Sequence, residues 1–211
     1  MRIQCIPGGM IPTNCYLLTD NATGETAIID PGFYDAQLKD AVKQKNVSMI
    51  LLTHGHFDHT LGVGPLAAQT GAKIYMYKDE ADFIGNPLNS LSSMAMCTIP
   101  TYQPDVLLKD GQTLTLGSLT IRVLHTPGHT HGGCCFLVGD ALFSGDTVMC
   151  GTVGRTDFPT GSFSDILASA QRLRDLPGEW RVLPGHEFET KLSWERKNNP
   201  YMEAGQNGFN T

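Results

Sequence analysis

The segment "LLTHGHFDHTLG" at residues 51–62 concentrates side chains that bind metal ions. It holds His54, His56, Asp58 and His59, although the whole chain has only 7 histidines in 211 residues. Folding alone gives no reason for this cluster, because neighbouring imidazoles repel once protonated and need hydrogen-bond partners when buried. Imidazole nitrogen suits zinc and iron, and a carboxylate adds the negative charge that holds a divalent ion. The segment therefore predicts a metal site.

The spacing within the segment favours two ions over one. Alternate residues of an extended loop point to the same side, so we expect His54 and His56 to converge on one ion. Asp58 and His59 are offset from that pair and can face a second ion nearby.

Three further metal-binding residues follow apolar strand patterns, each in a glycine-containing turn. His129 lies in "HTPGHTHGG", Asp146 in "LFSGDTV" and His186 in "VLPGHE". Strand ends that gather at one rim would bring them to the first cluster. Five histidines and two aspartates are too many ligands for one tetrahedral zinc, but they suffice for two ions if one carboxylate bridges.

Short strands and helices in two similar halves must position these side chains. Each half has a β-meander, a buried strand that ends in histidines, and a helix, although no sequence repeat can be aligned. Residues 79–105 are less periodic and predict an irregular excursion or lid. The strand patterns lie at 2–7, 14–20, 25–32, 47–53, 72–77, 112–125 (a hairpin), 133–146 and 181–184, and the helical patterns at 35–46, 60–70, 162–175 and about 187–198.

Composition bounds the class of protein. The length fits one domain over residues 1–211, and 41% hydrophobic residues suffice for a substantial core. A net charge of −6 without a long basic run argues against nucleic-acid and membrane-surface partners. Prolines and glycines interrupt the N-terminus before a signal-peptide core can form, and the six cysteines form no C-x-x-C pair. These features predict a cytoplasmic protein, and they leave the oligomeric state open.

The order of these motifs resembles the metallo-β-lactamase fold superfamily: Asp30 in "IIDPG", the H-x-H-x-D-H cluster, then His129, Asp146 and His186. The resemblance covers nearly the whole chain. It implies an α/β fold, a four-layer αββα sandwich with the metals at one edge. Within the superfamily the chain is similar to the glyoxalase II-like (hydroxyacylglutathione hydrolase-like) enzymes, in a short form without their C-terminal helical domain. The similar stretches are "TPGHTHGG", "VGRTDFPTGS" and "WERKNNPYM".

The resemblance also implies metal-binding roles. Asp146 would bridge the two ions, and Asp58 would in addition orient the nucleophile and so act in catalysis. Asp30 would accept a hydrogen bond from a metal-bound histidine, although a turn-capping role is the alternative. Two zinc ions are expected, with iron or manganese as alternatives. The first would be bound by His54, His56, His129 and Asp146, and the second by Asp58, His59, His186 and Asp146.

Three further histidine or arginine residues lie near these motifs, and the sequence fits more than one role for them. Arg155 in "GRTDFPTG" corresponds to a basic residue that faces glutathione carboxylates in the similar enzymes, because a guanidinium binds carboxylates with two hydrogen bonds. The alternative is an ion pair with Asp157 that fixes the loop. His131 is not a ligand by resemblance and could carry protons near the site, whereas His125 reads as a structural histidine.

The function implied is hydrolysis of a small, anionic acyl thioester such as S-lactoylglutathione by a hydroxide that bridges two metals. A mononuclear iron persulfide dioxygenase is the first alternative, because such enzymes share the H-x-H-x-D-H cluster and a similar "GRTDF" stretch. His186 favours the hydrolase, since it can complete a second metal site. A lactone hydrolase is a further alternative. The absent export signal disfavours a true β-lactamase, and His56 disfavours a diiron electron-transfer role. A non-catalytic module would usually have lost ligands, and none is missing.

Overall fold

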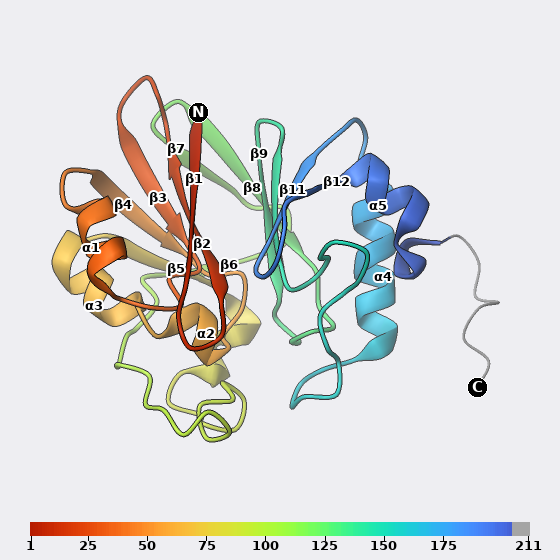
Figure 1. Ribbon diagram of the computed structural model, residues 1–211, viewed down its shortest axis with the longest axis horizontal. Helices are drawn as coiled ribbons and strands as arrows, with labels where there is room; N and C mark the ends of the chain where they lie inside the picture. The colour runs from red at the N-terminus through yellow and green to blue at the C-terminus, as the bar shows by residue number, and fades with distance from the viewer. Residues whose placement is uncertain (204–211) are drawn as a thin grey trace.

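Two six-stranded sheets pack face to face with helices on both outer sides, in a computed structural model that describes residues 1–203 (Figure 1). Helices α1 (Ala36–Val42) and α3 (Val63–Thr70) cover the outer face of the first sheet, and α4 (Phe163–Arg174) and α5 (Leu192–Asn198) cover the second. The structure thus confirms the predicted four-layer αββα sandwich.

The first sheet follows chain order, with antiparallel pairing among its first three strands and parallel pairing from the third strand onward. Helices α1 and α3 make the crossovers between parallel strands. Asp35 caps α1 by accepting a hydrogen bond from the Leu38 amide at 2.9 Å, and Leu38 and Val42 turn toward the sheet as buried residues. The strands are β1 (Arg2–Gly8), β2 (Thr13–Thr19), β3 (Glu25–Ile29), β4 (Asn46–Leu51), β5 (Lys73–Tyr77) and β6 (Val106–Leu108).

The second sheet reverses chain order, from β12 at one edge to β7 at the other. Its pairs are antiparallel except β10 with β11, which α4 connects. Its strands are β7 (Thr113–Leu116), β8 (Leu119–His125), β9 (Cys134–Val138), β10 (Ala141–Gly145), β11 (Arg181–Pro184) and β12 (Thr190–Lys191), and short helices α2 (Phe57–Thr60), η1 (Lys78–Phe83) and η2 (Pro200–Met202) complete the described chain.

Three apolar clusters hold the layers together. One fills the space between the sheets, and the other two lie between each sheet and its helices. Strand β4 contributes to both faces of its sheet, since Leu51 packs between the sheets and Ile50 packs under the helices. The buried strand predicted over residues 47–53 is thus covered on both faces. Among the described residues, no helix is both long and apolar enough to cross a membrane.

Several elements differ from the sequence prediction: the pattern over 133–146 forms two strands, β9 and β10, helix α1 ends at Val42, and β6 is not among the predicted strands. The helix expected over 60–70 begins at Val63 as α3, and a separate short helix, α2, precedes it; the Gly62 amide donates to the Pro31 carbonyl at 2.8 Å and so does not continue α2. The last helix begins at Leu192, since residues 190–191 pair with β11 as β12. The irregular segment 79–105 opens with η1, which begins at Lys78.

Candidate metal centre

The seven predicted metal-binding residues follow strands of both sheets and meet at one edge of the sandwich. Backbone hydrogen bonds join the sheets there: the Asn14 amide donates to the Gly185 carbonyl at 2.7 Å, and the Cys134 amide donates to the Thr53 carbonyl at 2.9 Å. The residues come from the loop after β4 (His54 and His56), α2 (Asp58 and His59), the loop after β8 (His129), and the ends of β10 (Asp146) and β11 (His186).

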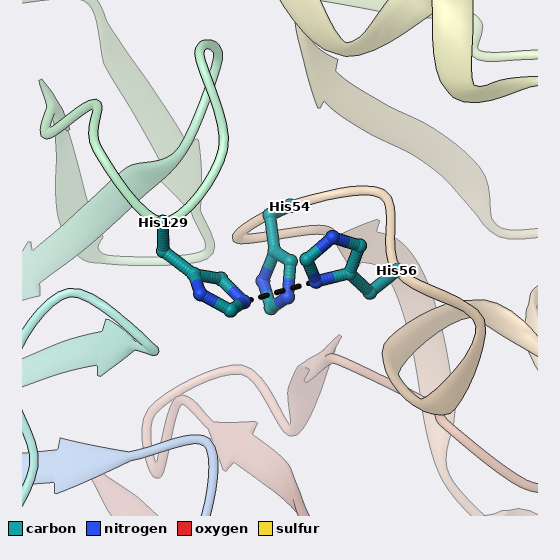
Figure 2. A group of neighbouring side chains, drawn as sticks. All are labelled: His54, His56 and His129. Carbon is teal, nitrogen blue, oxygen red and sulfur yellow. Dashed lines mark hydrogen bonds between the residues drawn. The ribbon is translucent and has the colours of Figure 1, made fainter. Parts of the chain in front are cut away.

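The first group consists of three buried histidines. Figure 2 shows the rings of His54, His56 and His129 turned toward one another, and one nitrogen from each lies within 4.8 Å of the others. Nδ1 of His56 lies 2.9 Å from Nε2 of His129. Burial and mutual repulsion hold the pKa of His54 and that of His56 well below the usual value, and burial lowers the pKa of His129. Neutral imidazole is the form that binds metal.

The second group consists of Asp58, His59 and His186, whose ligand atoms also lie within 4.8 Å of one another. Nε2 of His186 is 3.3 Å from Oδ2 of Asp58 and 3.2 Å from Nε2 of His59. Burial would raise the pKa of Asp58, but the adjacent His59 and His186 lower it overall, so this carboxylate is ionised at neutral pH.

The Asp146 carboxylate lies between the two groups. Its Oδ2 is 3.4 Å from Nε2 of His129 in the first group and 3.5 Å from Nε2 of His186 in the second. Its Oδ1 is 3.6 Å from Nε2 of His59. One carboxylate that reaches both groups suits a dinuclear metal site with a shared ligand.

Position 185, beside His186, requires glycine for a steric reason. A β-carbon at Gly185 would lie 2.3 Å from Oδ1 of Asp146. Only glycine lets the β11 end approach the Asp146 carboxylate this closely.

Unpaired polar atoms within residues 1–203 support metal binding. Nε2 of His54 and Oδ1 of Asp146 are buried and have no hydrogen-bond partner. Buried polar atoms rarely remain unpaired, so a ligand from outside the chain is the natural partner for them. Nitrogen and carboxylate oxygen together suit zinc, iron or manganese.

Acceptors behind the rings orient three of the histidines. His59 Nδ1 lies 3.0 Å from Oδ2 of Asp30, His129 Nδ1 donates to the Arg155 carbonyl at 2.7 Å, and His186 Nδ1 donates to the Pro12 carbonyl at 2.7 Å. Each ring therefore turns Nε2 toward the site.

The carboxylate of Asp30 accepts hydrogen bonds from Thr53, from the amide at 2.8 Å and from the hydroxyl at 2.6 Å, and it faces His59. It does not cap its own turn. This geometry favours the predicted role behind a metal-binding histidine over the turn-capping alternative.

The acidic surroundings also set the charge of His59. Burial disfavours the imidazolium, but the carboxylates of Asp58, Asp146 and Asp30 outweigh it and raise the pKa of His59 to about 10. An ion that binds the second group must displace this proton, so its affinity falls as the pH falls.

Sequence reasoning missed Glu80, a fully buried carboxylate behind the first group. Its Oε2 accepts a hydrogen bond from the Gly55 amide at 2.7 Å, and its Oε1 accepts one from the Gly132 amide at 2.8 Å. It thereby links the loop of His54 and His56 to the loop of His129. Burial raises its pKa to about 7, against the opposing effect of these hydrogen bonds. No local motif marks Glu80, because only the fold brings the two loops to it.

Arg155, His131 and His125 lie outside the two groups. The Arg155 guanidinium binds Asp157 with two hydrogen bonds of 2.9 and 2.7 Å, which is the geometry of the loop-fixing alternative, and the substrate role remains a prediction. His131 contacts the Asp79 carbonyl and belongs to neither metal group. His125 stacks on Tyr77 with ring centroids 4.3 Å apart, as a structural histidine does.

A cleft of about 450 Å³ opens onto this centre. Its floor includes His56, Asp58, His129, Asp146 and His186, so both metal groups are accessible from it. This volume lies within the usual range for small-molecule sites.

Comparison with known proteins places this geometry in context. The family model described as "Metallo-beta-lactamase superfamily" matches residues 8–186. A Haemophilus influenzae protein named "Hydroxyacylglutathione hydrolase GloC" is 30% identical over 211 residues, covering 97% of this chain and 99% of the relative. The crystal structure of BLEG-1 B3 metallo-beta-lactamase is 34% identical with a TM-score of 0.90, over 96% of this chain and 100% of that one. The structure of TTHA1623 in a di-iron-bound form is 31% identical with a TM-score of 0.83, over 94% and 99%.

We expect Glu80→Gln to weaken metal binding at the first group. An amide has one acceptor oxygen where the carboxylate has two, so either the Gly55 or the Gly132 amide loses its partner and a ligand loop loosens. Residues that support ligands from behind typically contribute 10- to 100-fold to metal affinity, so a loss of about tenfold or more is expected. Competition with a chelating indicator measures it. Glu179→Gln, an exposed site, is the control, and unchanged affinity in Glu80→Gln would contradict the assigned role.

The raised pKa of Glu80 also predicts a pH dependence. The folded protein holds this proton up to a pKa of about 7, whereas the unfolded chain releases it near 4.5. Stability from the protonated form is therefore complete below pH 4.5 and is lost as the pH rises through 7. Relative to metal-free Glu80→Gln, the metal-free wild type should lose about 3 kcal/mol of unfolding free energy over this range. Denaturant unfolding of both proteins at several pH values measures this change. The prediction is wrong if the difference in unfolding free energy between the two proteins stays constant with pH.

Proposed function

The chain belongs to the metallo-beta-lactamase superfamily, and we propose that it uses two zinc ions to hydrolyse small acyl thioesters of the S-lactoylglutathione type. The observation that carries the proposal is the Asp146 carboxylate between two complete ligand groups. A mononuclear iron dioxygenase has no use for a second group, whereas His186 lies beside Asp58 and His59. The similarity to a protein named hydroxyacylglutathione hydrolase supports the substrate class.

The side chains of the centre have different roles in the proposed reaction. When bound, two zinc ions act as Lewis acids that bring the pKa of water close to neutrality and polarise a carbonyl group. His54, His56 and His129 would hold the first ion and Asp58, His59 and His186 the second, and Asp146 lies where its carboxylate could be shared by both. Asp30 keeps His59 in the orientation that ligation requires.

The reaction consumes one water for each thioester. The carbonyl carbon gains a bond to the water oxygen and loses its bond to sulfur, giving a carboxylic acid and a thiol. A thiolate is a stable leaving group, so the reaction does not need a strong general acid. Asp58 lines the cleft as an ionised carboxylate, which places it where it can orient the attacking water.

Hydrolysis of a β-lactam is a second candidate, favoured by the 34% identity to a structure titled as a B3 metallo-beta-lactamase. Ions held by the same two ligand groups would polarise an amide carbonyl. An amine is a poorer leaving group than a thiolate and needs a proton as it departs. A chromogenic cephalosporin assayed beside S-lactoylglutathione separates the two activities.

We expect Asp58→Ala to remove thioester hydrolysis and leave the fold intact. Loss of a group that merely supports a ligand costs 10- to 100-fold, so loss of a ligand should lower kcat/KM for S-lactoylglutathione by more than about 100-fold. The assay uses zinc-loaded protein, with circular dichroism for the fold and elemental analysis for metal content. Asp140→Ala, an exposed site in the β9–β10 turn, is the control.

Metal analysis of the wild type, purified without added metal, belongs to the same test. Two zinc ions per chain support the hydrolase, whereas one iron per chain supports the dioxygenase. Near wild-type hydrolysis by a folded Asp58→Ala protein would overturn the proposed mechanism.

Arg155→Ala tests whether the substrate carries a carboxylate. If Arg155 binds it, KM for S-lactoylglutathione should rise with little change in kcat, because a remote carboxylate is bound equally in the ground and transition states. A charge-assisted hydrogen bond contributes about 1.5–3 kcal/mol, so a rise of roughly tenfold or more is expected.

Asp157→Ala is the matched control for this test, since it frees Arg155 without removing it. A small uncharged thioester should be hydrolysed equally by all three proteins. Equal losses in both variants on both substrates would instead mean that the ion pair only fixes the loop.

A further inference from the structure

The walls of the cleft above the metal centre are apolar. Seven hydrophobic side chains line it, one of which is Phe57 in α2. The other six come from three separate segments: the β1–β2 turn, the segment after η1, and the loop after β10. Three distant parts of the chain thus contribute the same chemistry to one wall. The six are Ile11, Leu91, Met94, Ala95, Met149 and Phe158.

The middle segment is fixed to the metal centre. The Phe57 amide, one residue before Asp58, donates to the Ser90 carbonyl at 2.8 Å. Leu91 follows directly, is 7% exposed, and has a φ of 59°, which is unfavourable for a residue with a branched side chain. This anchoring holds the apolar wall beside the ligand Asp58.

The outer part of the wall exposes apolar surface to water. Met94 is 68% exposed and Ile11 is 45% exposed. Exposed apolar side chains that gather at one site mark a binding surface, and methionine adapts to ligands of different shape.

The cleft has few charged groups besides the metal-binding residues. Apart from the metal ligands, the charged residues among the described lining are Arg155 and Glu187. Arg155 is already paired with Asp157, and its guanidinium carbon lies 4.2 Å from the centre of the Phe158 ring. A charged acyl group would therefore lose water against Ile11, Leu91 and Met94 and gain no hydrogen-bond partner from those side chains.

We infer that, among small acyl thioesters, the cleft favours those whose acyl group is an apolar chain longer than acetyl. The inference rests on the proposed thioester hydrolysis. The carbonyl must lie at the metal groups on the cleft floor, so the chain attached to it lies against the apolar wall. Each methylene buried there should raise kcat/KM about fourfold.

An acyl-length series on one thiol tests this selectivity. Acetyl, butyryl and hexanoyl thioesters of N-acetylcysteamine are assayed with the zinc-loaded protein. From acetyl to butyryl, kcat/KM should rise roughly 15-fold for two methylenes. Met94→Ser should flatten the series. Met96→Ser is the matched control, because Met96 is 93% exposed in the same segment and does not line the cleft.

The outcomes separate the inference from the function on which it rests. If acetyl thioester is hydrolysed and the series is flat, or if both methionine variants behave alike, the inference is wrong and the hydrolase stands. If no thioester is hydrolysed, the proposed function is wrong, but calorimetry still tests whether the cleft prefers longer apolar chains. Hexanoate should bind the zinc-loaded protein at least tenfold more tightly than acetate, and Met94→Ser should remove the difference. Equal binding of the two acids would overturn the inference independently.

Discussion

The fold must hold five histidines and two aspartates close together at one edge of the sandwich. Protonated together the histidines would repel, and neutral they need partners, so the sandwich supplies both burial and support. Burial keeps His54 and His56 uncharged, while carboxylates at the other group charge His59. Asp146 reaches both groups because the ends of β10 and β11, paired in parallel, bring it beside His186. The centre therefore depends on strands of both sheets ending at the same edge.

Hydrogen bonds to the metal-binding histidines and to their loops determine how well the centre is preorganised. Hydrogen bonds orient the rings of His59, His129 and His186 from outside the site, using Asp30 and two backbone carbonyls. Glu80 acts one layer further out, on the backbone of the ligand loops. A buried carboxylate without a cationic partner is costly for folding, as its pKa of about 7 indicates. That cost is understandable if the two amides it binds keep the loops in register for metal.

The predictable part of this protein is local. The H-x-H-x-D-H cluster is contiguous, and strand patterns that end in metal-binding residues predict their common edge. The resemblance to the superfamily supplies the four-layer sandwich and the assignment of residues to two groups. Glu80 could not be found this way, because its partners Gly55 and Gly132 are backbone amides that lie far away in the chain. The boundary between α2 and α3 likewise involves a tertiary hydrogen bond, from the Gly62 amide to the Pro31 carbonyl. Long-range backbone contacts leave no periodicity to read.

The centre and the cleft rest on different kinds of structure. The metal-binding residues follow strands at the edge of two packed sheets, where displacement would disturb the core. The apolar wall rests on connecting segments, where Ile11, Met94 and Phe158 can change without altering the sheets. In the proposed reaction, chemistry and selectivity are therefore separable: the metal-binding residues would determine that a carbonyl is attacked, and the loops would determine what is attached to it. The strained Leu91 connects the two, since its neighbour Ser90 is bonded to the helix that carries Asp58.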